Sequence, residues 1–174
     1  MHENVPTPYL VIVTGPPRAG KTTLSAELSK ALPSTPLYIE ADAYLPRASV
    51  DHSWWAANNE RIALALHRSV LAWIQAGYSV ILDGSLPEPP QLIARCLQIF
   101  EGVPRVVVGV VCAPDELTRR AVATGRSPSW SLHHLSTFGT AVELSVQVDT
   151  SELTLEQCIQ RVVACLATCS GTST

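Results

Sequence analysis

The residues with the clearest chemical role lie near the start of the chain. Residues 15–22 read Gly-Pro-Pro-Arg-Ala-Gly-Lys-Thr and match the phosphate-binding pattern GxxxxGK[ST], the P-loop, at every fixed position. In such a loop, consecutive backbone N–H groups and the positive end of the next helix converge on a β-phosphate, Lys21 reaches the β and γ oxygens, and Thr22 ligates Mg²⁺. The pattern predicts binding of ATP, with GTP as the alternative, together with Mg²⁺.

The two prolines narrow the set of residues that can contact the nucleotide. Pro16 and Pro17 have no N–H to donate, so the donors must come from the half of the loop nearest the helix. The expected nucleotide-binding residues are Gly15, Arg18, Ala19, Gly20, Lys21, Thr22 and Thr23.

Two carboxylates are spaced to complete a phosphoryl-transfer site. Asp42 follows the short run 37–40, and Asp83 ends the apolar run 80–83. Ligands of an open α/β sheet bind beyond the carboxyl ends of the strands, so both should face Lys21. Asp42 suits a base that accepts the proton of a substrate hydroxyl, and Asp83 suits an acid that reaches Mg²⁺ or orients the substrate. A turn or N-cap role is the alternative for Asp42, and a purely structural one for Asp83.

Cationic and aromatic residues could surround the reacting groups. Arg120 and Arg126 are the candidates to stabilise the transferring phosphoryl group, with a solvated helix face as the alternative. Tyr44, Trp54 and Trp55 lie downstream of Asp42 and could wall an acceptor pocket, although core packing explains one tryptophan equally well. His133 and His134 lack partners at metal-ligand spacing and fit a lid or a surface.

The elements that must position these residues alternate between strand and helix. Apolar β-branched runs predict strands, and segments of helical period predict helices between them. The expected strands cover 9–14, 37–40, 78–83, 103–112 and 144–148, and the expected helices cover 20–32, 54–75, 89–100, 115–123 and 155–166, the last opened by a capping box of Thr154 and Gln157. This order predicts an α/β fold with a five-stranded parallel sheet, helices on both faces and a lid at about 115–140.

Length and composition limit the remaining possibilities. The 174 residues fit one domain over 1–174, with 47% hydrophobic and 16% charged residues. A net charge of −3 argues against binding nucleic acid or membranes by bulk electrostatics, and no apolar run approaches a membrane span. Five cysteines without a CxxC pair suggest neither a disulfide framework nor a zinc site. We expect a cytoplasmic protein without a signal peptide, and leave a homo-oligomer open.

Together these motifs resemble the chloramphenicol phosphotransferase-like antibiotic kinases. The resemblance rests on the P-loop, the interval from Lys21 to Asp42, the strand ending in Asp83, and the segments 107–112 and 146–150. It implies a three-layer P-loop kinase fold, with Asp42 as base, Lys21 as phosphate clamp, and Arg120 and Arg126 as lid arginines. The acceptor would be a hydroxyl of an antibiotic, either chloramphenicol-like or a capuramycin-type nucleoside, and the outcome resistance or self-protection.

Two other functions compete with this interpretation. A metabolic kinase for a sugar acid, a shikimate-like acid or a nucleotide would have the same fold, but anionic acceptors usually need an arginine cluster, and only Arg47 lies near Asp42. A regulatory NTPase switch is disfavoured because the lysines, at 21 and 30 only, leave no NKxD guanine-recognition motif.

Overall fold

The apolar runs of the sequence form a parallel sheet in the computed structural model of the protein. The structure describes residues 7–32, 34–45, 50–84, 89–138 and 142–170. Within these ranges the sheet has five strands in the order β2-β3-β1-β4-β5, and each neighbouring pair is parallel. The strands are β1 (Leu10–Thr14), β2 (Leu37–Glu40), β3 (Val80–Asp83), β4 (Arg105–Val111) and β5 (Val146–Asp149).

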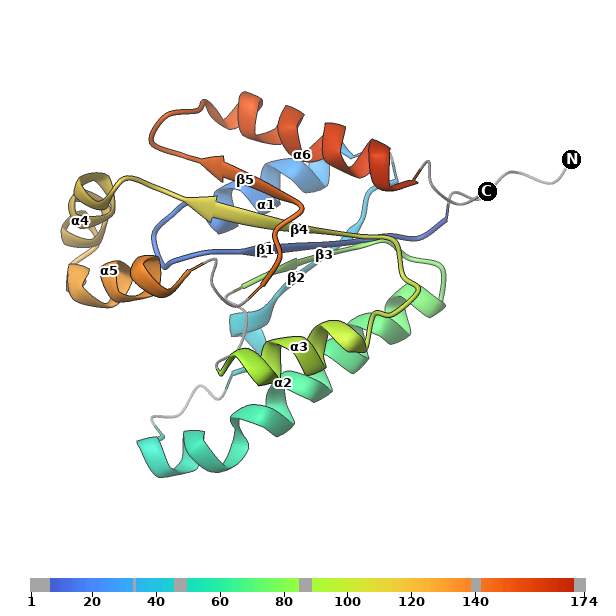
Figure 1. Cartoon of the computed structure of the whole chain (residues 1–174), viewed down its shortest axis with the longest axis horizontal. Coiled ribbons are helices and arrows are strands. Elements are labelled where there is room, and N and C mark those ends of the chain that lie inside the picture. Colours follow the sequence, from blue (N-terminus) through green and yellow to red (C-terminus); the bar gives the residue numbers. More distant parts are fainter. Residues whose placement is uncertain (1–6, 33, 46–49, 85–88, 139–141, 171–174) are drawn as a thin grey trace, which may run out of the picture.

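Helices cover both faces of this sheet and make three layers (Figure 1). One face is covered by α1 (Lys21–Ala31) and α6 (Leu155–Ser170), and the other by α2 (His52–Gln75) and α3 (Pro90–Gln98). The predicted fold class is confirmed. None of the helices in the described ranges combines the length and the hydropathy needed to cross a bilayer.

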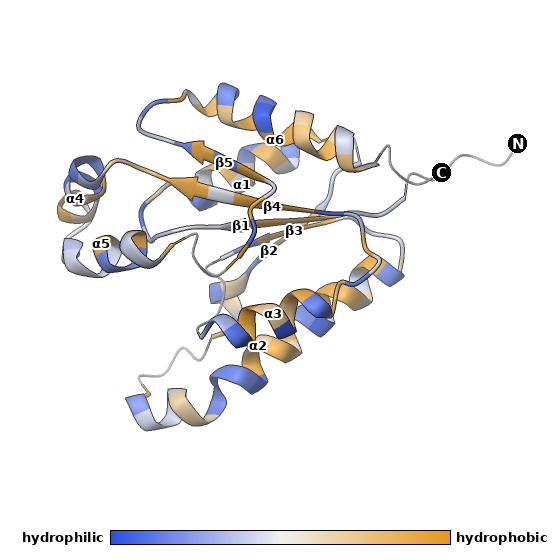
Figure 2. Ribbon diagram, in the orientation of Figure 1, coloured by the Kyte–Doolittle hydropathy of each residue, from blue (hydrophilic) through white to orange (hydrophobic). Residues whose placement is uncertain are grey.

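Burial on both faces explains why the strands read as unbroken apolar runs. In β1, Val11 and Val13 pack into the core beneath α1 and α6, whereas Leu10 and Ile12 pack into the core beneath α2. The hydropathy colouring shows apolar strands at the centre and polar residues on the outer sides of the helices (Figure 2). The strands therefore form a rigid platform whose carboxyl ends can carry a site.

Two helices at the carboxyl end of the sheet occupy most of the region that the sequence predicts to be a lid. They are α4 (Pro114–Ala123) and α5 (Pro128–Thr137), and they pack against each other. The polar stretch after Gly125, for which the sequence indicated no regular structure, is mostly α5. Ser127 caps this helix and Pro128 stands in its first turn. Of the predicted lid, residues 139 and 140 lie outside the described ranges.

Side-chain hydrogen bonds explain several boundaries. Asp51 accepts a hydrogen bond from the N–H of Trp54 at 2.8 Å, so α2 begins at His52, ahead of the predicted start. The capping box of Thr154 and Gln157 is confirmed by reciprocal bonds of 2.9 and 3.3 Å. The predicted start of β5 at 144 is wrong, and the strand begins at Val146. The N–H of Val107 donates to the Ser145 hydroxyl at 3.0 Å, whereas in a regular sheet a backbone carbonyl would accept this bond.

Candidate active site

The P-loop connects β1 to α1, and its backbone conformation requires glycine at two positions. Gly15 has a φ of +147°, and a Cβ there would overlap the carbonyl oxygen of Val110. Gly20 is the N-cap of α1 with a φ of +100°, in the left-handed region. The first turn of α1 has no acidic residue. The positive end of the helix thus remains available for an anion.

Lys21 is held over this loop by two of the loop's own carbonyls. Its Nζ donates to the oxygens of Gly15 at 2.9 Å and Pro16 at 3.0 Å. Burial lowers the pKa of Lys21, while the charges of Asp83 and Asp42 act in the opposite direction. Both predicted carboxylates therefore lie within electrostatic range of the lysine.

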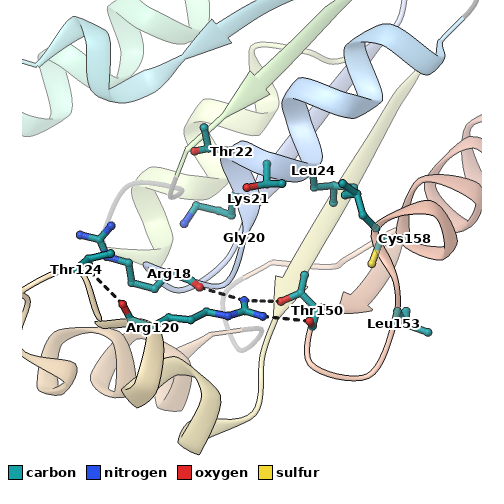
Figure 3. A pocket seen from close by; sticks show the side chains of 12 residues that line it. Arg18, Gly20, Lys21, Thr22, Leu24, Arg120, Thr124, Thr150, Leu153 and Cys158 are labelled. Carbon is teal, nitrogen blue, oxygen red and sulfur yellow. Dashed lines mark hydrogen bonds between the residues drawn. The ribbon is translucent and has the colours of Figure 1, made fainter. Parts of the chain in front are cut away.

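One hollow, of about 500 Å³, opens on the α6 side of the P-loop (Figure 3). Loop residues and α1 form one wall, and α4, the segment after β5 and the start of α6 form the other. It is lined by Arg18, Gly20, Lys21, Thr22, Thr23, Leu24, Arg120, Thr124, Thr150, Leu153, Leu155 and Cys158. Its mixture of loop N–H groups, cations and apolar side chains suits a nucleotide.

Arg120 is anchored at the rim of this hollow. Its Nε donates to Glu116 at 2.7 Å, and its Nη1 donates to the hydroxyl of Thr150 at 2.9 Å (Figure 3). Hydrogen bonds from Arg119 and Arg120 lower the pKa of Glu116 to about 2. Arg120, which the sequence assigned to the phosphoryl group, is thus fastened to α4 and to the segment after β5.

Thr150 joins the last strand to the P-loop. Its hydroxyl donates to the carbonyl oxygen of Ala19 at 2.6 Å, and its N–H donates to Val111 at 3.0 Å. Thr150 belongs to the segment 146–150 that supports the family resemblance, but nothing in the sequence indicated this contact. The segment after β5 therefore holds one turn of the P-loop in place.

A second hollow has a volume of about 720 Å³ and opens on the other side of Lys21, and we name it the acceptor cleft after the role that the sequence predicts for Asp42, which lines it. Asp42 lies exposed on the short 3₁₀ helix Ala41–Tyr44, and Asp83 lies buried at the end of β3. Arg126 is exposed in the link between α4 and α5. The lining residues are Pro17, Arg18, Lys21, Thr22, Glu40, Asp42, Leu45, Asp83, Gly84, Arg126, Ser127, Trp130, Ser131 and His134.

The carboxylate of Asp83 is held from one side only. Its Oδ2 accepts a hydrogen bond from the hydroxyl of Tyr38 at 2.8 Å. The pKa of Tyr38 is raised, mainly because the hydroxyl is buried and secondly because it makes this hydrogen bond. Its Oδ1 is buried and has no hydrogen-bond partner among the described residues. A buried carboxylate oxygen without a partner is costly, and a cation, a water or a substrate hydroxyl would satisfy it.

These residues fit a magnesium ion. Asp83 and Thr22 both line the acceptor cleft and supply the hard oxygen ligands that Mg²⁺ prefers. Across the described residues no three His, Cys, Asp or Glu side chains gather to hold a metal. The protein therefore offers few ligands and leaves the rest of the shell to phosphate and water, as is usual for Mg²⁺.

Three aromatic residues predicted for the acceptor pocket lie elsewhere. Tyr44 is exposed and is not among the residues that line the cleft. Trp54 and Trp55 contact each other edge to face at the start of α2, and Trp55 lines a third hollow against α3. Arg47 lies outside the described residues. The aromatic side chains of the cleft come instead from α5, as Trp130 and His134.

The two hollows meet at the P-loop. Arg18, Lys21 and Thr22 line both of them, so a molecule in one and a molecule in the other approach each other at Lys21. This arrangement can hold a triphosphate on one side and an acceptor on the other, with Asp42 and Asp83 on the acceptor side.

The sequence profile of chloramphenicol phosphotransferase-like proteins matches residues 8–167. The chain belongs to this family. Among curated protein sequences none matches the chain. Membership of the chloramphenicol phosphotransferase-like family, together with the P-loop kinase fold, makes it a small-molecule phosphotransferase.

Solved structures show the breadth of this fold. A sugar kinase from Janibacter sp. HTCC2649 has 20% identity and a TM-score of 0.68, covering 96% of this chain and 99% of that one. The Mycobacterium tuberculosis APS kinase, in complex with AMPPNP and APS, has 15% identity and a TM-score of 0.65, covering 93% and 99%. The tunicamycin resistance protein of Deinococcus radiodurans has 18% identity and a TM-score of 0.61, covering 90% and 94%. At these identities they relate the chloramphenicol phosphotransferase-like chain to P-loop kinases by fold alone.

Proposed function

We propose that this protein transfers the γ-phosphate of ATP to a hydroxyl of a small-molecule antibiotic in the cytoplasm. The observation that carries this proposal is the pair of hollows that share Arg18, Lys21 and Thr22. A single-site hydrolase or switch needs one nucleotide pocket, whereas a transferase needs a second cavity for an acceptor at the γ-phosphate.

The nucleotide binds with its phosphates along the loop N–H groups and at the positive end of α1. Lys21 exchanges its carbonyl partners for phosphate oxygens and stabilises the charge that develops as the γ-phosphoryl group leaves. ATP is favoured over GTP by analogy with the structural relative that holds AMPPNP.

Transfer requires a base on the acceptor side. Asp42 accepts the proton of the acceptor hydroxyl, the hydroxyl oxygen forms a bond to the γ-phosphorus, and the bond to the β–γ bridging oxygen breaks to release ADP. Arg126, exposed on the rim of the cleft, balances charge on the γ-phosphoryl oxygens. Mg²⁺, held by Thr22 and by Oδ1 of Asp83, would neutralise phosphate charge when bound.

We assign an antibiotic as the acceptor. Family membership supports an antibiotic, either a chloramphenicol-like drug or a capuramycin-type nucleoside. The acceptor cleft, at about 720 Å³, lies within the range of cavities that hold drug-sized ligands. Phosphorylation of such a drug would confer resistance on the host or protect a producer from its own product.

The direct test is acceptor phosphorylation measured by mass spectrometry. The protein, ATP and Mg²⁺ are incubated with hydroxyl-bearing antibiotics and, in parallel, with sugar acids, shikimate and nucleosides. The expected result is an antibiotic that gains the mass of one phosphoryl group, with no gain in the Lys21→Met variant. Phosphorylation confined to the metabolites would support a metabolic kinase instead, and nucleotide hydrolysis without any acceptor product would refute the transfer reaction.

A further inference from the structure

We propose that Trp130 of α5 is the platform on which the acceptor's ring binds, and that the acceptor is a ring compound with a free hydroxyl and no negative charge. The inference rests on the proposed function, because it describes the acceptor side of the same cleft. It assigns acceptor recognition to α5, and removes it from Trp54 and Trp55.

The first observation is the exposure of an indole within the cleft. Trp130 has 62% of its surface exposed and lines the acceptor cleft from the first turn of α5. One turn later His134 lies edge to face against it, with ring centroids 4.3 Å apart at 71°. This contact restrains the indole and leaves most of its surface to solvent. A restrained, exposed aromatic face is suited to stacking on a flat or sugar-like ring.

The second observation is the division of charge within the cleft. The cationic lining residues are Arg18 and Lys21 of the P-loop and Arg126 of the lid. Three acidic lining residues end or follow β2 and β3, namely Glu40, Asp42 and Asp83. A phosphate is therefore favoured at the P-loop, and an anionic acceptor beside the carboxylates of Glu40 and Asp42 is disfavoured by like-charge repulsion.

The third observation shows what the acidic part of the cleft requires. With Oδ1 of Asp83 held by Mg²⁺, the carboxylates that remain open to the acceptor are those of Glu40 and Asp42, which are exposed and line the cleft. Carboxylates accept hydrogen bonds and cannot donate them. Hydroxyl and amine donors on the acceptor satisfy such oxygens, whereas a carboxylate or phosphate on the acceptor does not.

These three features select a chemical class. Stacking requires a ring, the carboxylates require donor groups and tolerate no anion, and transfer requires a hydroxyl within reach of Asp42. Trp54 and Trp55 do not line the cleft, and Trp55 faces a hollow that contains the ion pair of Glu60 and Arg95 at 2.7 Å. Trp55 therefore serves as the matched control for Trp130.

Binding is tested without turnover by fluorine NMR on protein labelled with 5-fluorotryptophan. The chain has four tryptophans, and the Trp130→Phe and Trp55→Phe variants assign two of the four signals. The protein is first saturated with AMPPNP and Mg²⁺, so that added probes cannot occupy the nucleotide pocket. Chloramphenicol and uridine are the uncharged ring probes, and gluconate and shikimate are the anionic ones.

The expected result is a saturable shift of the Trp130 signal with chloramphenicol or uridine, and none with gluconate or shikimate at equal concentration. The Trp55 signal stays in place throughout. A shift of Trp55 in place of Trp130, an equal shift with the anionic probes, or no shift of Trp130 with either uncharged probe overturns the inference.

Kinetics with whichever acceptor is phosphorylated separate this inference from the proposed function. Trp130→Ala is expected to raise the acceptor KM about 10-fold or more, the order of one lost stacking contact, with the KM for ATP unchanged. Trp55→Ala changes neither. Probe binding at Trp130 without any phosphorylation would refute the kinase assignment alone, whereas phosphorylation with an acceptor KM insensitive to Trp130→Ala would refute the platform alone.

Discussion

At the scale of single residues, the proposed reaction assigns nucleotide binding and acceptor chemistry to different side chains. In the proposed reaction Lys21 and the loop N–H groups bind the phosphates, whereas Asp42 is exposed on a short 3₁₀ helix and lines the acceptor cleft. Because Asp42 forms part of no core, its charge can be removed without disturbing the fold. This separation makes its role testable by a substitution that preserves shape.

Asp42→Asn is expected to lower acceptor phosphorylation by about 10² or more, because it removes the proton acceptor. ATP affinity, measured by calorimetry, and thermal stability should change little. Asp83→Asn is the comparison, and it should weaken the dependence of activity on Mg²⁺. If Asp42→Asn loses Mg²⁺ and ATP binding while Asp83→Asn keeps both, the two roles are exchanged.

Thr150→Val is expected to weaken ATP binding several-fold, because it removes the hydroxyl that holds the carbonyl of Ala19 at 2.6 Å and keeps the side-chain shape. Thr124→Val is the matched control, since Thr124 lines the same hollow but its hydroxyl bonds only carbonyls of its own helix. Calorimetric titration with AMPPNP measures both. Equal losses in the two variants would count against a role for Thr150 beneath the P-loop.

At the scale of elements, the two arginines predicted for the lid differ in their surroundings. Arg120 bonds Glu116 and Thr150, whereas Arg126 is exposed in the link to α5 and lines the acceptor cleft. The two side chains therefore contribute differently to folding and to turnover, although they lie six positions apart in one sequence.

Arg126→Ala is expected to lower kcat about 10-fold or more with an unchanged melting temperature, because it removes a positive charge that stabilises the transferring phosphoryl group. Arg120→Ala should lower the melting temperature, because it breaks the contacts of α4 with Thr150 and leaves Glu116 with one partner fewer. Steady-state kinetics and thermal unfolding distinguish them. An Arg126→Ala variant that loses stability and rate in proportion would indicate a structural arginine.

The sequence predicted the elements wherever a local pattern determines them. The strands are apolar runs bounded by turns, and the P-loop is a local motif, so both could be read without tertiary information. Helix α5 could not, because it mixes Ser, His and Trp without a strong apolar face. The position of Trp130 in the cleft depends on how α5 packs against α4, which is a tertiary contact. Asp51 caps the start of α2, and Trp55 in the first turns of this helix lines the hollow against α3. The sequence therefore predicted an acceptor pocket at Trp54 and Trp55, whereas the cleft beside Asp42 is lined by Trp130.

At the scale of the whole molecule, a buried histidine in α2 is expected to make stability depend on pH. His67 is buried between the helix and Phe100, with ring centroids 5.8 Å apart, and its Nδ1 lies 2.7 Å from the carbonyl oxygen of Ala63. Burial lowers the pKa of His67 below the ordinary value of 6.5. The unfolded chain therefore binds more protons than the folded chain below that value.

The free energy of unfolding should accordingly fall as the pH drops below about 6.5, down to the pKa of the folded state. His67→Gln should remove part of this dependence, whereas His52→Gln, at an exposed position, should retain it. Urea unfolding at about pH 5 and about pH 7.5 measures all three proteins. A wild-type stability that is constant over this interval would contradict the assignment.

The contact between Thr150 and Ala19 also orders events during synthesis. The P-loop emerges from the ribosome early, but the residue that fastens its carbonyl follows 131 positions later, behind the last strand. A nascent chain that still lacks β5 carries the nucleotide-binding motif without its support. We therefore expect ATP to bind such a nascent chain several-fold more weakly than it binds the complete chain.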